Sequence, residues 1–405
     1  MPVREAKIST STLANAHSLF TGLKLDPSYL RQLDIGDIAR RELMEARKLC
    51  RAALRQAAQG IAARDALWQD EWRSAAKRPL RGPVVVKFMT QGSFAYETIN
   101  DPPRDTQEID LDDGMYVPVE FLSNGEPALA ARALFDFVVE TLTPLAENEG
   151  WLEVAPKTNC VRVRLWKGAH LDIPIYSVPR ERFVMLSDSL AKSHHAVLTR
   201  SMMHDSYRLP SDKIMLARQD GTWIPSDPQK LQDWVDGRVE QYGPVFRRVA
   251  RFFKGWRDYE WQSSDLSSLC LMCAVDEGLR RYSNDAGGLP SEERDDVLVL
   301  EVARRLPDIL DDKVCNPVLD SCLNEWDAPA KAEILNKASS LKTRMSSAIE
   351  STGDAYEVVR KLRLIFGERI PNRPDAVKIA SEIAAVVYAE PRSNPAPNII
   401  PSTSG

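Results

Sequence analysis

Residues 107–114 read QEIDLDDG, with two aspartates, Asp110 and Asp112, one residue apart. Ile109 and Leu111 alternate with them, as in a half-buried β-strand. Side chains at positions i and i+2 of a strand point to the same face of the sheet. The spacing therefore predicts a strand that presents both carboxylates on one face, while the two aliphatic side chains point into the core.

A third aspartate, Asp172, lies in the apolar stretch LDIPI at residues 171–175. On an adjoining strand it would bring three carboxylates together, and these repel one another unless cations lie among them. Mg²⁺ binds carboxylate oxygens together with substrate phosphates, and two metal ions about 4 Å apart stabilise both oxygens of an in-line phosphoryl displacement. The pattern predicts a nucleotidyltransferase in which Asp110, Asp112 and Asp172 are catalytic and hold two Mg²⁺ ions, with Mn²⁺ as the alternative. The nearby His170 is expected to support these ligands without binding metal.

An Asp-x-Asp pattern also occurs by chance, and the adjacent Asp113 is equally typical of a solvated turn. Two features favour the catalytic interpretation. Residues 84–89 read VVVKFM, and this β-branched run predicts a buried strand. The strand leads into Gln91, Gly92 and Ser93, where a glycine allows backbone amides to approach a phosphate and the start of a helix adds its positive end.

Several segments together resemble the bacterial cGAS/DncV-like nucleotidyltransferases, most closely the DncV-type cyclic GMP-AMP synthases. They follow the family order, and they read QGSFAYETIN at 91–100, EIDLDDGMY at 108–116, HLDIPIY at 170–176, WIPSDP at 223–228, RFFKGWRD at 251–258 and LSSL at 266–269. The resemblance implies a two-lobed α+β fold of the polymerase-β type. A small mixed sheet carries the aspartates in that fold, and a helical C-terminal lobe closes over the nucleotide cleft.

The resemblance also implies a reaction. ATP and GTP are joined by attack of a 3′-hydroxyl on an α-phosphate with release of pyrophosphate, and a second transfer closes the ring of 3′,3′-cyclic GMP-AMP. In the family this product is a second messenger of anti-phage (CBASS) defence that activates a downstream effector. Asp172 is expected to help deprotonate the attacking hydroxyl. No nucleic-acid template is expected.

Basic residues recur on a predicted helix. Arg247, Arg251 and Lys254 follow i, i+4, i+7 spacing and therefore share one helix face. A solvated basic face is the alternative interpretation. The resemblance singles out Lys254 as the lysine that holds the triphosphate, and it points to Ser268 as a hydroxyl partner for phosphate.

Four further residues are expected to contact the nucleotides. Tyr96 belongs to the nucleotide pocket by resemblance. Arg162 is expected to read guanine, because guanidinium donors match the O6 and N7 acceptors of that base. Ser226 and Asp227 are expected to add guanine contacts, although the same pair is also typical of a cap for the helix that follows.

The composition narrows the class of protein. The chain has 405 residues, is 43% hydrophobic and carries a formal net charge of −5, which argues against a protein that coats nucleic acid through bulk charge. The sequence contains neither an eighteen-residue apolar run nor a secretory signal, so a cytoplasmic location and no membrane association are expected. The Cys270-x-x-Cys273 pair lies in an apolar helical run, which favours core packing over zinc or redox chemistry.

The chain is expected to divide into four stretches: an N-terminal helical brace at 1–80, the catalytic core at 81–240, the helical C-terminal lobe at 241–390 and a flexible tail at 391–405. The tail is rich in proline and small polar residues. It ends at Gly405, and the resemblance implies conjugation of that glycine to targets by a ligase similar to E1 and E2 enzymes. A frayed tail without a role is the alternative.

Two other functions stay open at this stage. A few pocket residues decide which bases are joined, so the chain could make another cyclic di- or trinucleotide. A catalytically silent nucleotide-binding regulator is the second alternative, although aspartates at all three positions weigh against it.

Overall fold

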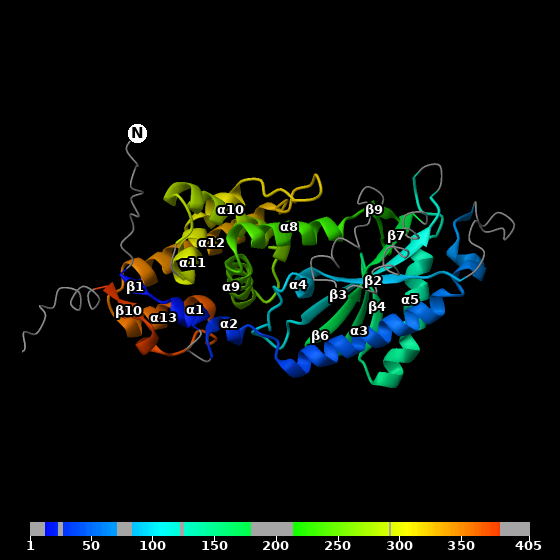
Figure 1. Ribbon diagram of the computed structural model, residues 1–405, viewed down its shortest axis with the longest axis horizontal. Helices are drawn as coiled ribbons and strands as arrows, with labels where there is room; N and C mark the ends of the chain where they lie inside the picture. Colours follow the sequence, from blue (N-terminus) through cyan, green and yellow to red (C-terminus); the bar gives the residue numbers. More distant parts are fainter. Residues whose placement is uncertain are drawn as a thin grey trace, which may run out of the picture.

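The computed structural model describes residues 13–22, 27–70, 83–121, 125–179, 214–290 and 293–380. The expectations for the tail at 391–405 and for conjugation at Gly405 lie outside these ranges and stay predictions. Within them the fold is α+β with two lobes, as expected, and Figure 1 shows a sheet lobe at one end of the molecule and a helical lobe at the other. No helix in these ranges is both long and apolar enough to cross a membrane.

The sheet lobe is built on one mixed sheet of eight strands, which is larger than the small sheet expected. Its strands are β2 (Lys87–Gln91), β3 (Ile109–Val119), β4 (Glu153–Pro156), β5 (Val161–Trp166), β6 (Ala169–Ile173), β7 (Ile175–Pro179), β8 (Met215–Ala217) and β9 (Trp223–Pro225). The helices of this lobe are α3 (Asp37–Ala58), α4 (Gly92–Ala95) and α5 (Ala131–Glu149), with short 3₁₀ turns at Ile61–Ala63 and Asp65–Leu67.

The long strand β3 organises the sheet. Its first half pairs in parallel with β6 and its second half in parallel with β7, with one constant register on both sides of Pro174. Antiparallel neighbours complete the layer, because β2 pairs with β3, β5 with β6, and β8 with β7. The strand predicted at 84–89 is displaced by a few residues: β2 begins at Lys87, and Val84 and Val86 are buried just before it.

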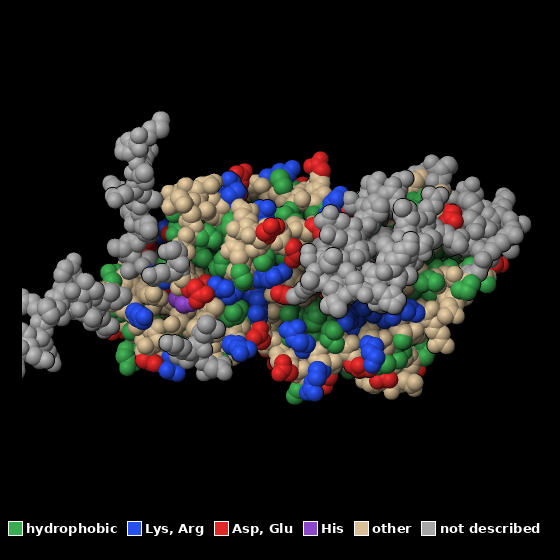
Figure 2. All heavy atoms as spheres, viewed as in Figure 1, with side chains coloured by type: hydrophobic (Ala, Val, Ile, Leu, Met, Phe, Trp, Pro, Cys, Tyr) green, Lys and Arg blue, Asp and Glu red, His purple; other side chains and the backbone are tan. Residues whose placement is uncertain are grey.

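Helix α3 lies along the sheet (Figure 1) and supplies much of its core. Its buried residues recur at helical spacing, as an amphipathic helix requires, and they are Leu43, Ala46, Cys50, Leu54 and Ala58. The opposite side of α3 is rich in arginine and lysine, and Figure 2 shows blue side chains gathered on this part of the surface. A negative net charge therefore coexists with a locally basic face.

The helical lobe contains the second large core. Its helices are α1 (His17–Thr21), α2 (Tyr29–Gln32), α8 (Pro228–Tyr242), α9 (Val245–Glu260), α10 (Ser268–Ala286), α11 (Asp295–Asp311), α12 (Ala328–Glu350) and α13 (Ala355–Phe366), with a 3₁₀ turn at Pro374–Ala376. Phe252, Phe253 and Trp256 are buried in this core. The N-terminal segment enters it through α1, α2 and a two-stranded sheet of β1 (Ala14–Asn15) and β10 (Lys378–Ile379).

The first described stretch of chain therefore contributes to both lobes. Phe20 and Tyr29 pack in the helical core, whereas Leu43 and Leu54 of α3 pack under the sheet. This arrangement fits the brace expected for residues 1–80, while the exact division of the chain into domains stays a prediction.

Candidate active site

The register of the sheet explains why the acidic residues meet. Asp112 on β3 lies opposite Asp172 on the parallel strand β6, and Gln91 on β2 lies on the other side of Asp112. On β5, Arg162 lies opposite Asp172. One row of side chains, in the order Arg162, Asp172, Asp112 and Gln91, therefore crosses four adjacent strands, and residues in such a row share a face.

A second row lies two residues earlier along β3. It consists of Asp110 on β3, His170 on β6 and Arg164 on β5. The Nε2 atom of His170 is 3.0 Å from Asp110 Oδ1 and 3.9 Å from Asp172 Oδ2. Its Nδ1 atom is 2.8 Å from Glu108 Oε2, and Arg164 donates to the other Glu108 oxygen at 3.0 Å. The imidazole is thereby held between the acidic residues.

Two basic side chains, Arg162 and His170, lie among the carboxylates. The sequence did not predict these pairings. Arg162 donates from Nε and Nη2 to the two oxygens of Asp172 at 2.8 and 2.7 Å. This bidentate pair occupies the donors that were expected to read guanine. Burial of His170 works to lower its pKa, but the carboxylates of Asp110 and Asp172 outweigh burial and raise the pKa.

Asp110, His170 and Asp172 bring one potential ligand atom each to within 4.8 Å of one another. Asp110 Oδ1 and His170 Nε2 are both buried and neither makes a well-directed hydrogen bond. Unsatisfied oxygen and nitrogen atoms in an acidic cluster fit a divalent cation. The structure thus adds His170 to the candidate ligands, whereas Asp112, expected as a ligand, lies outside this closest group.

Asp112 borders Gly92 instead. Gly92 has a φ of +66°, and a Cβ atom at this position would lie 2.0 Å from Asp112 Oδ2. Burial raises the pKa of Asp112 well above its usual range, and the charges of Asp110 and Asp172 raise it further. The helix that begins at Gly92 is a single turn of four residues, so its positive end contributes less than the sequence suggested.

The neighbouring Asp113 is not in a solvated turn. It lies on the opposite face of β3, is 2% exposed, and receives a bidentate ion pair from Arg51 of α3 and a hydrogen bond from Thr90 at 3.0 Å. The strand therefore separates two kinds of carboxylate: Asp110 and Asp112 face the cleft, and Asp113 fixes α3.

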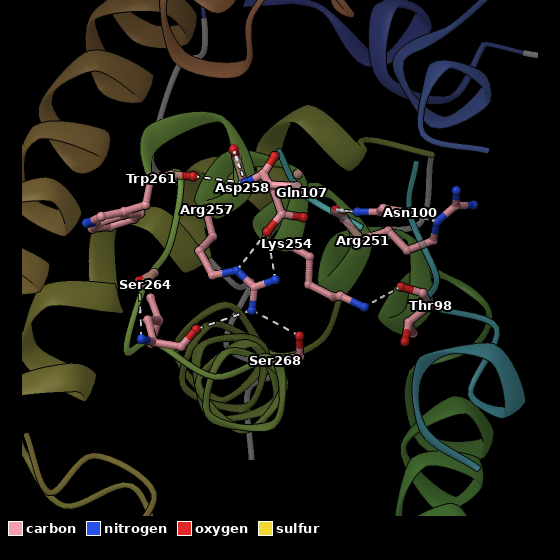
Figure 3. Close-up of polar contacts among 12 residues, drawn as sticks. Thr98, Asn100, Gln107, Arg251, Lys254, Arg257, Asp258, Trp261, Ser264 and Ser268 are labelled. Carbon is pink, nitrogen blue, oxygen red and sulfur yellow. Dashed lines mark hydrogen bonds and ion pairs between the residues drawn. The ribbon is translucent and has the colours of Figure 1, made fainter. Parts of the chain in front are cut away.

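Lys254 approaches the cleft from the helical lobe. It lies on α9, is 5% exposed, and donates from Nζ to the backbone oxygen of Thr98 at 2.7 Å (Figure 3). Burial lowers its pKa to about 7, and the charge of Arg257 acts in the same direction. The other two members of the predicted basic face are paired as well: Arg247 with Asp236, and Arg251 with Asp34. The solvated face is therefore the wrong alternative.

Arg257 is a cleft residue that sequence reasoning left out. Its Nη1 atom donates to Ser268 Oγ at 2.9 Å, and its Nε and Nη2 atoms donate to Asp258 Oδ1 at 2.9 and 2.7 Å (Figure 3). Its position three residues after Lys254 on α9 was the available signal, since such residues share a helix face. Ser268, predicted to contact phosphate, thus already has a charged neighbour.

Two adjoining cavities unite most of the predicted residues. The larger, of about 700 Å³, is lined by residues of both lobes that include Gly92, Ser93, Tyr96, Asp110, Asp112, Arg162, His170, Lys254, Arg257 and Ser268. The smaller, of about 200 Å³, is lined by Gln91, Tyr176, Ser226 and Asp227 among others. Both cavities share Gly92, Tyr96, Asp112 and Leu231. Asp112 therefore borders both cavities, with Arg162 of the same row in the larger one and Gln91 in the smaller one.

The smaller cavity has a rigid aromatic and polar wall. Gln91 Nε2 donates to the hydroxyl of Tyr176 at 2.8 Å, and the Tyr176 ring stacks on Tyr116 with 4.8 Å between centroids. Asp227 Oδ1 accepts from Lys230 N at 2.9 Å and so caps α8. The cap predicted from the sequence is confirmed, and base recognition by Asp227 and Ser226 stays a prediction.

Family models match both lobes. Residues 86–176 match the nucleotidyltransferase domain of DncV-like cyclic GMP-AMP synthases, and residues 243–379 match the cyclic GMP-AMP synthase C-terminal domain. A cyclic GMP-AMP synthase of Vibrio cholerae serotype O1 is 32% identical over 338 residues, which cover 79% of this chain and 75% of the relative. One from Escherichia coli is 31% identical over 333 residues, with coverage of 76% and 74%.

Solved structures agree with these matches. The crystal structure of Vibrio cholerae DncV cyclic AMP-GMP synthase with the linear intermediate 5′ pppA(3′,5′)pG superposes with a TM-score of 0.74 at 25% sequence identity, and covers 91% of this chain and 99% of that one. The DncV complex with GTP and 5MTHFGLU2 gives a TM-score of 0.73. Together with the acidic cluster in the cleft, these matches show that the chain belongs to the DncV-like nucleotidyltransferases and is an enzyme of that family.

Proposed function

We propose that this cyclic dinucleotide synthase joins ATP and GTP into 3′,3′-cyclic GMP-AMP. The observation that carries the proposal is the acidic row between two cavities, opposite a lysine from the other lobe. A reaction between two nucleotides needs two adjoining spaces with the reacting groups at their boundary. The relatives named as cyclic GMP-AMP synthases, and the DncV complex with a linear pppA-pG intermediate, support the choice of substrates.

The roles of the residues follow from their positions. Lys254 and Arg257 offer positive charge to the triphosphate in the larger cavity, and Ser93, Tyr96 and Ser268 line the same space. In the smaller cavity, Ser226 and Asp227 would recognise a base beside the stacked Tyr176.

Asp110, Asp112 and Asp172 would hold divalent cations, and His170 is a further candidate ligand. Two bound Mg²⁺ ions would neutralise charge on the transferred phosphoryl group and orient its attacking and leaving oxygens. Asp172, held by Arg162, is the group proposed to assist removal of the proton from the attacking 3′-hydroxyl. Arg162 in this scheme orients Asp172, and guanine reading by its remaining donor is secondary.

The biological part of the proposal goes further. We assign the product to signalling in anti-phage defence, with a downstream effector that the cyclic dinucleotide activates. Conjugation of Gly405 by an E1/E2-like ligase belongs to the same proposal.

The test is product identification. Purified protein is incubated with all four NTPs and Mg²⁺, and the product is mapped by mass spectrometry and by nucleases specific for 3′–5′ linkages. We expect 3′,3′-cyclic GMP-AMP with release of pyrophosphate, and no product from Asp112→Asn or after EDTA treatment. A different cyclic nucleotide would contradict the assigned bases. Nucleotide binding without any pyrophosphate release would identify a silent regulator instead.

A further inference from the structure

Two cysteines face each other in the segment between α11 and α12. Cys315 and Cys322 form an isolated antiparallel bridge. The bridge lies between two backbone hydrogen bonds of 2.9 Å, from Asn316 N to Ser321 O and from Leu323 N to Val314 O. Such a pattern defines a non-hydrogen-bonded pair, in which the Cα atoms are roughly 4.5 Å apart and the side chains lie close on one side.

The separation of the two Cα atoms is within the range that a disulfide requires. Disulfide-linked residues have Cα atoms about 4.4–6.8 Å apart, and a non-hydrogen-bonded cross-strand pair falls at the lower end of that range. Both thiols are free in the structure; Cys315 is exposed and Cys322 is half-buried. Oxidants in solution can therefore reach Cys315.

The other two cysteines of this lobe behave differently. Cys270 is buried and Cys273 half-buried in α10. Burial raises the pKa of the Cys270 thiol to about 12 and raises that of Cys273 as well, so few of these thiols ionise and they attack slowly. Across the described ranges, only the group Asp110, His170 and Asp172 gathers three metal-ligating atoms within 4.8 Å. Cys315 and Cys322, the pair that includes an exposed thiol, are therefore the cysteines most open to oxidation.

The hairpin 315–322 reaches the nucleotide cleft. Its tip residues Asn316, Val318 and Leu319 line the smaller cavity, opposite Gln91, Tyr176 and Ser226 of the sheet lobe. Asn316 Oδ1 shapes the tip by accepting from the backbone N of Val318 at 2.9 Å and of Leu319 at 3.1 Å.

Asn324 anchors the base of the hairpin through four hydrogen bonds. Asn324 donates from Nδ2 to the backbone oxygens of Leu310 at 3.0 Å and Asp312 at 2.6 Å, and its Oδ1 accepts from Val314 N at 2.9 Å and from Cys322 Sγ at 3.0 Å.

We propose that Cys315 and Cys322 form a reversible disulfide that closes the base of the hairpin 315–322 and alters nucleotide binding in the smaller cavity. The second half of this proposal rests on the proposed function, whereas disulfide formation does not. Formation of the bond draws the two Cβ atoms to about 3.8 Å, which tightens the base and shifts the tip against the cavity wall.

The oxidant is a low-molecular-weight disulfide such as oxidised glutathione. The Cys315 thiolate attacks one sulfur of the oxidant and releases one glutathione thiolate, leaving a mixed disulfide. The Cys322 thiolate then attacks the Cys315 sulfur and releases the second glutathione. The two cysteine protons end on the two glutathione thiolates, so one disulfide is consumed and one is formed.

The first arm of the test detects the bond. Both cysteines fall in one tryptic peptide, between Lys313 and Lys331, so oxidation removes two hydrogens from that peptide and blocks its alkylation. We expect this loss of two hydrogens in wild type and in the control Cys160→Ser. In Cys322→Ser, which lacks the resolving thiol, we expect the mixed disulfide to persist as a glutathione adduct on Cys315. A peptide that stays fully alkylated in the oxidised wild type would overturn the proposal.

The second arm measures the coupling to the cleft. Affinities for ATP and GTP are measured on reduced, oxidised and re-reduced full-length protein, by a binding assay that does not require turnover. We expect oxidation to weaken one of them at least threefold, dithiothreitol to restore it, and Cys315→Ser and Cys322→Ser to show no change. A disulfide that leaves both affinities unchanged would disprove the coupling, and it would leave the proposed synthase activity untouched.

Discussion

Gly92 lies so close to Asp112 that a side chain on Gly92 would collide with the Asp112 carboxylate. A Cβ atom on Gly92 would be 2.0 Å from Asp112 Oδ2, and the φ of +66° disfavours any other residue. We expect Gly92→Ala to displace the Asp112 carboxylate and lower kcat/KM at least tenfold, as measured by pyrophosphate release.

A matched control separates the clash from the backbone cost. Gly150, at the end of α5, also has a positive φ, +70°, but a Cβ atom on this residue would meet nothing within 4 Å. Both substitutions should cost roughly 1 kcal/mol of stability and lower the thermal midpoint by a few degrees, because both glycines have a positive φ. Gly150→Ala should nevertheless retain full activity. Equal activity in both variants would exclude the steric role of Gly92.

The buried Lys254 predicts a pH dependence of nucleotide binding. Its pKa is lowered from 10.5 to about 7, so the ammonium loses its proton as the pH rises through neutrality. We expect the dissociation constant for nucleotide to rise between about pH 7 and 9, by at most tenfold per pH unit. Lys254→Met should bind more weakly at pH 6 and lack this dependence.

The same pKa predicts the opposite trend for folding. From about pH 7 to 10.5 the unfolded chain binds more protons at Lys254 than the folded protein does. The contribution of this group to stability therefore rises with pH over that window. Urea titrations of wild type and Lys254→Met across these pH values measure it, and parallel stability curves would show that the lysine is not buried uncharged.

At the scale of elements, β3 is fastened to α3 by the pair of Arg51 and Asp113. The side chains are 19% and 2% exposed, and removal of one partner from such a pair leaves a buried charge. We expect Arg51→Met to lower the free energy of unfolding by about 3 kcal/mol, measured by urea denaturation. Arg55→Met is the control, because the guanidinium of Arg55 lies over the Phe88 ring at 5.2 Å and has no ion pair among the described residues. Its loss should cost about 1 kcal/mol or less.

The alternation of residues in β3 was predictable from the sequence, because a strand has only two faces. That rule placed Asp110 and Asp112 together and Ile109 and Leu111 in the core. The segments matched to the family then identified the partner strand with Asp172 and the helix with Lys254, and the fold that they imply is confirmed.

Pairings between distant segments were not predictable. Arg51 is far from Asp113 along the chain, and the bond between Arg162 and Asp172 depends on the register of β5 against β6. Local patterns indicate the face of a residue but not its neighbour across the sheet. For this reason a solvated turn stayed open for Asp113, the pairing of Arg162 with Asp172 was not foreseen, and Arg257 was left out of the site.

At the scale of the whole molecule, one segment of the sheet lobe holds the end of α9. Arg104 donates to the backbone oxygens of Asp258 at 2.8 Å and Trp261 at 2.6 Å, and also to that of Tyr259. Gln107 donates to the same Asp258 and Trp261 oxygens at 2.9 and 3.0 Å. These bonds fix the orientation of the helix that carries Lys254 relative to the acidic row.

Loss of the Arg104 hydrogen bonds should weaken the contact between the two lobes without unfolding either lobe. We expect Arg104→Ala to raise the KM for nucleotide severalfold and to speed hydrogen exchange at residues 258–261, because three carbonyls lose a charged donor. Arg280→Ala is the control, since the hydrogen bonds that Arg280 donates within the described residues go to Glu277 on its own helix. Unchanged exchange in Arg104→Ala would show that other contacts hold the lobes.

The order of these parts along the chain has a consequence during protein synthesis. A ribosome produces Asp110 and Asp112 early, Asp172 later and Lys254 later still, and the strand Lys378–Ile379 that pairs with Ala14–Asn15 near the end. Domains fold from the N-terminus as they emerge. A nascent chain therefore carries its acidic strands long before the lobe that completes the cleft, and catalysis must wait until the residues of α9 and the helices packed on it have left the ribosome.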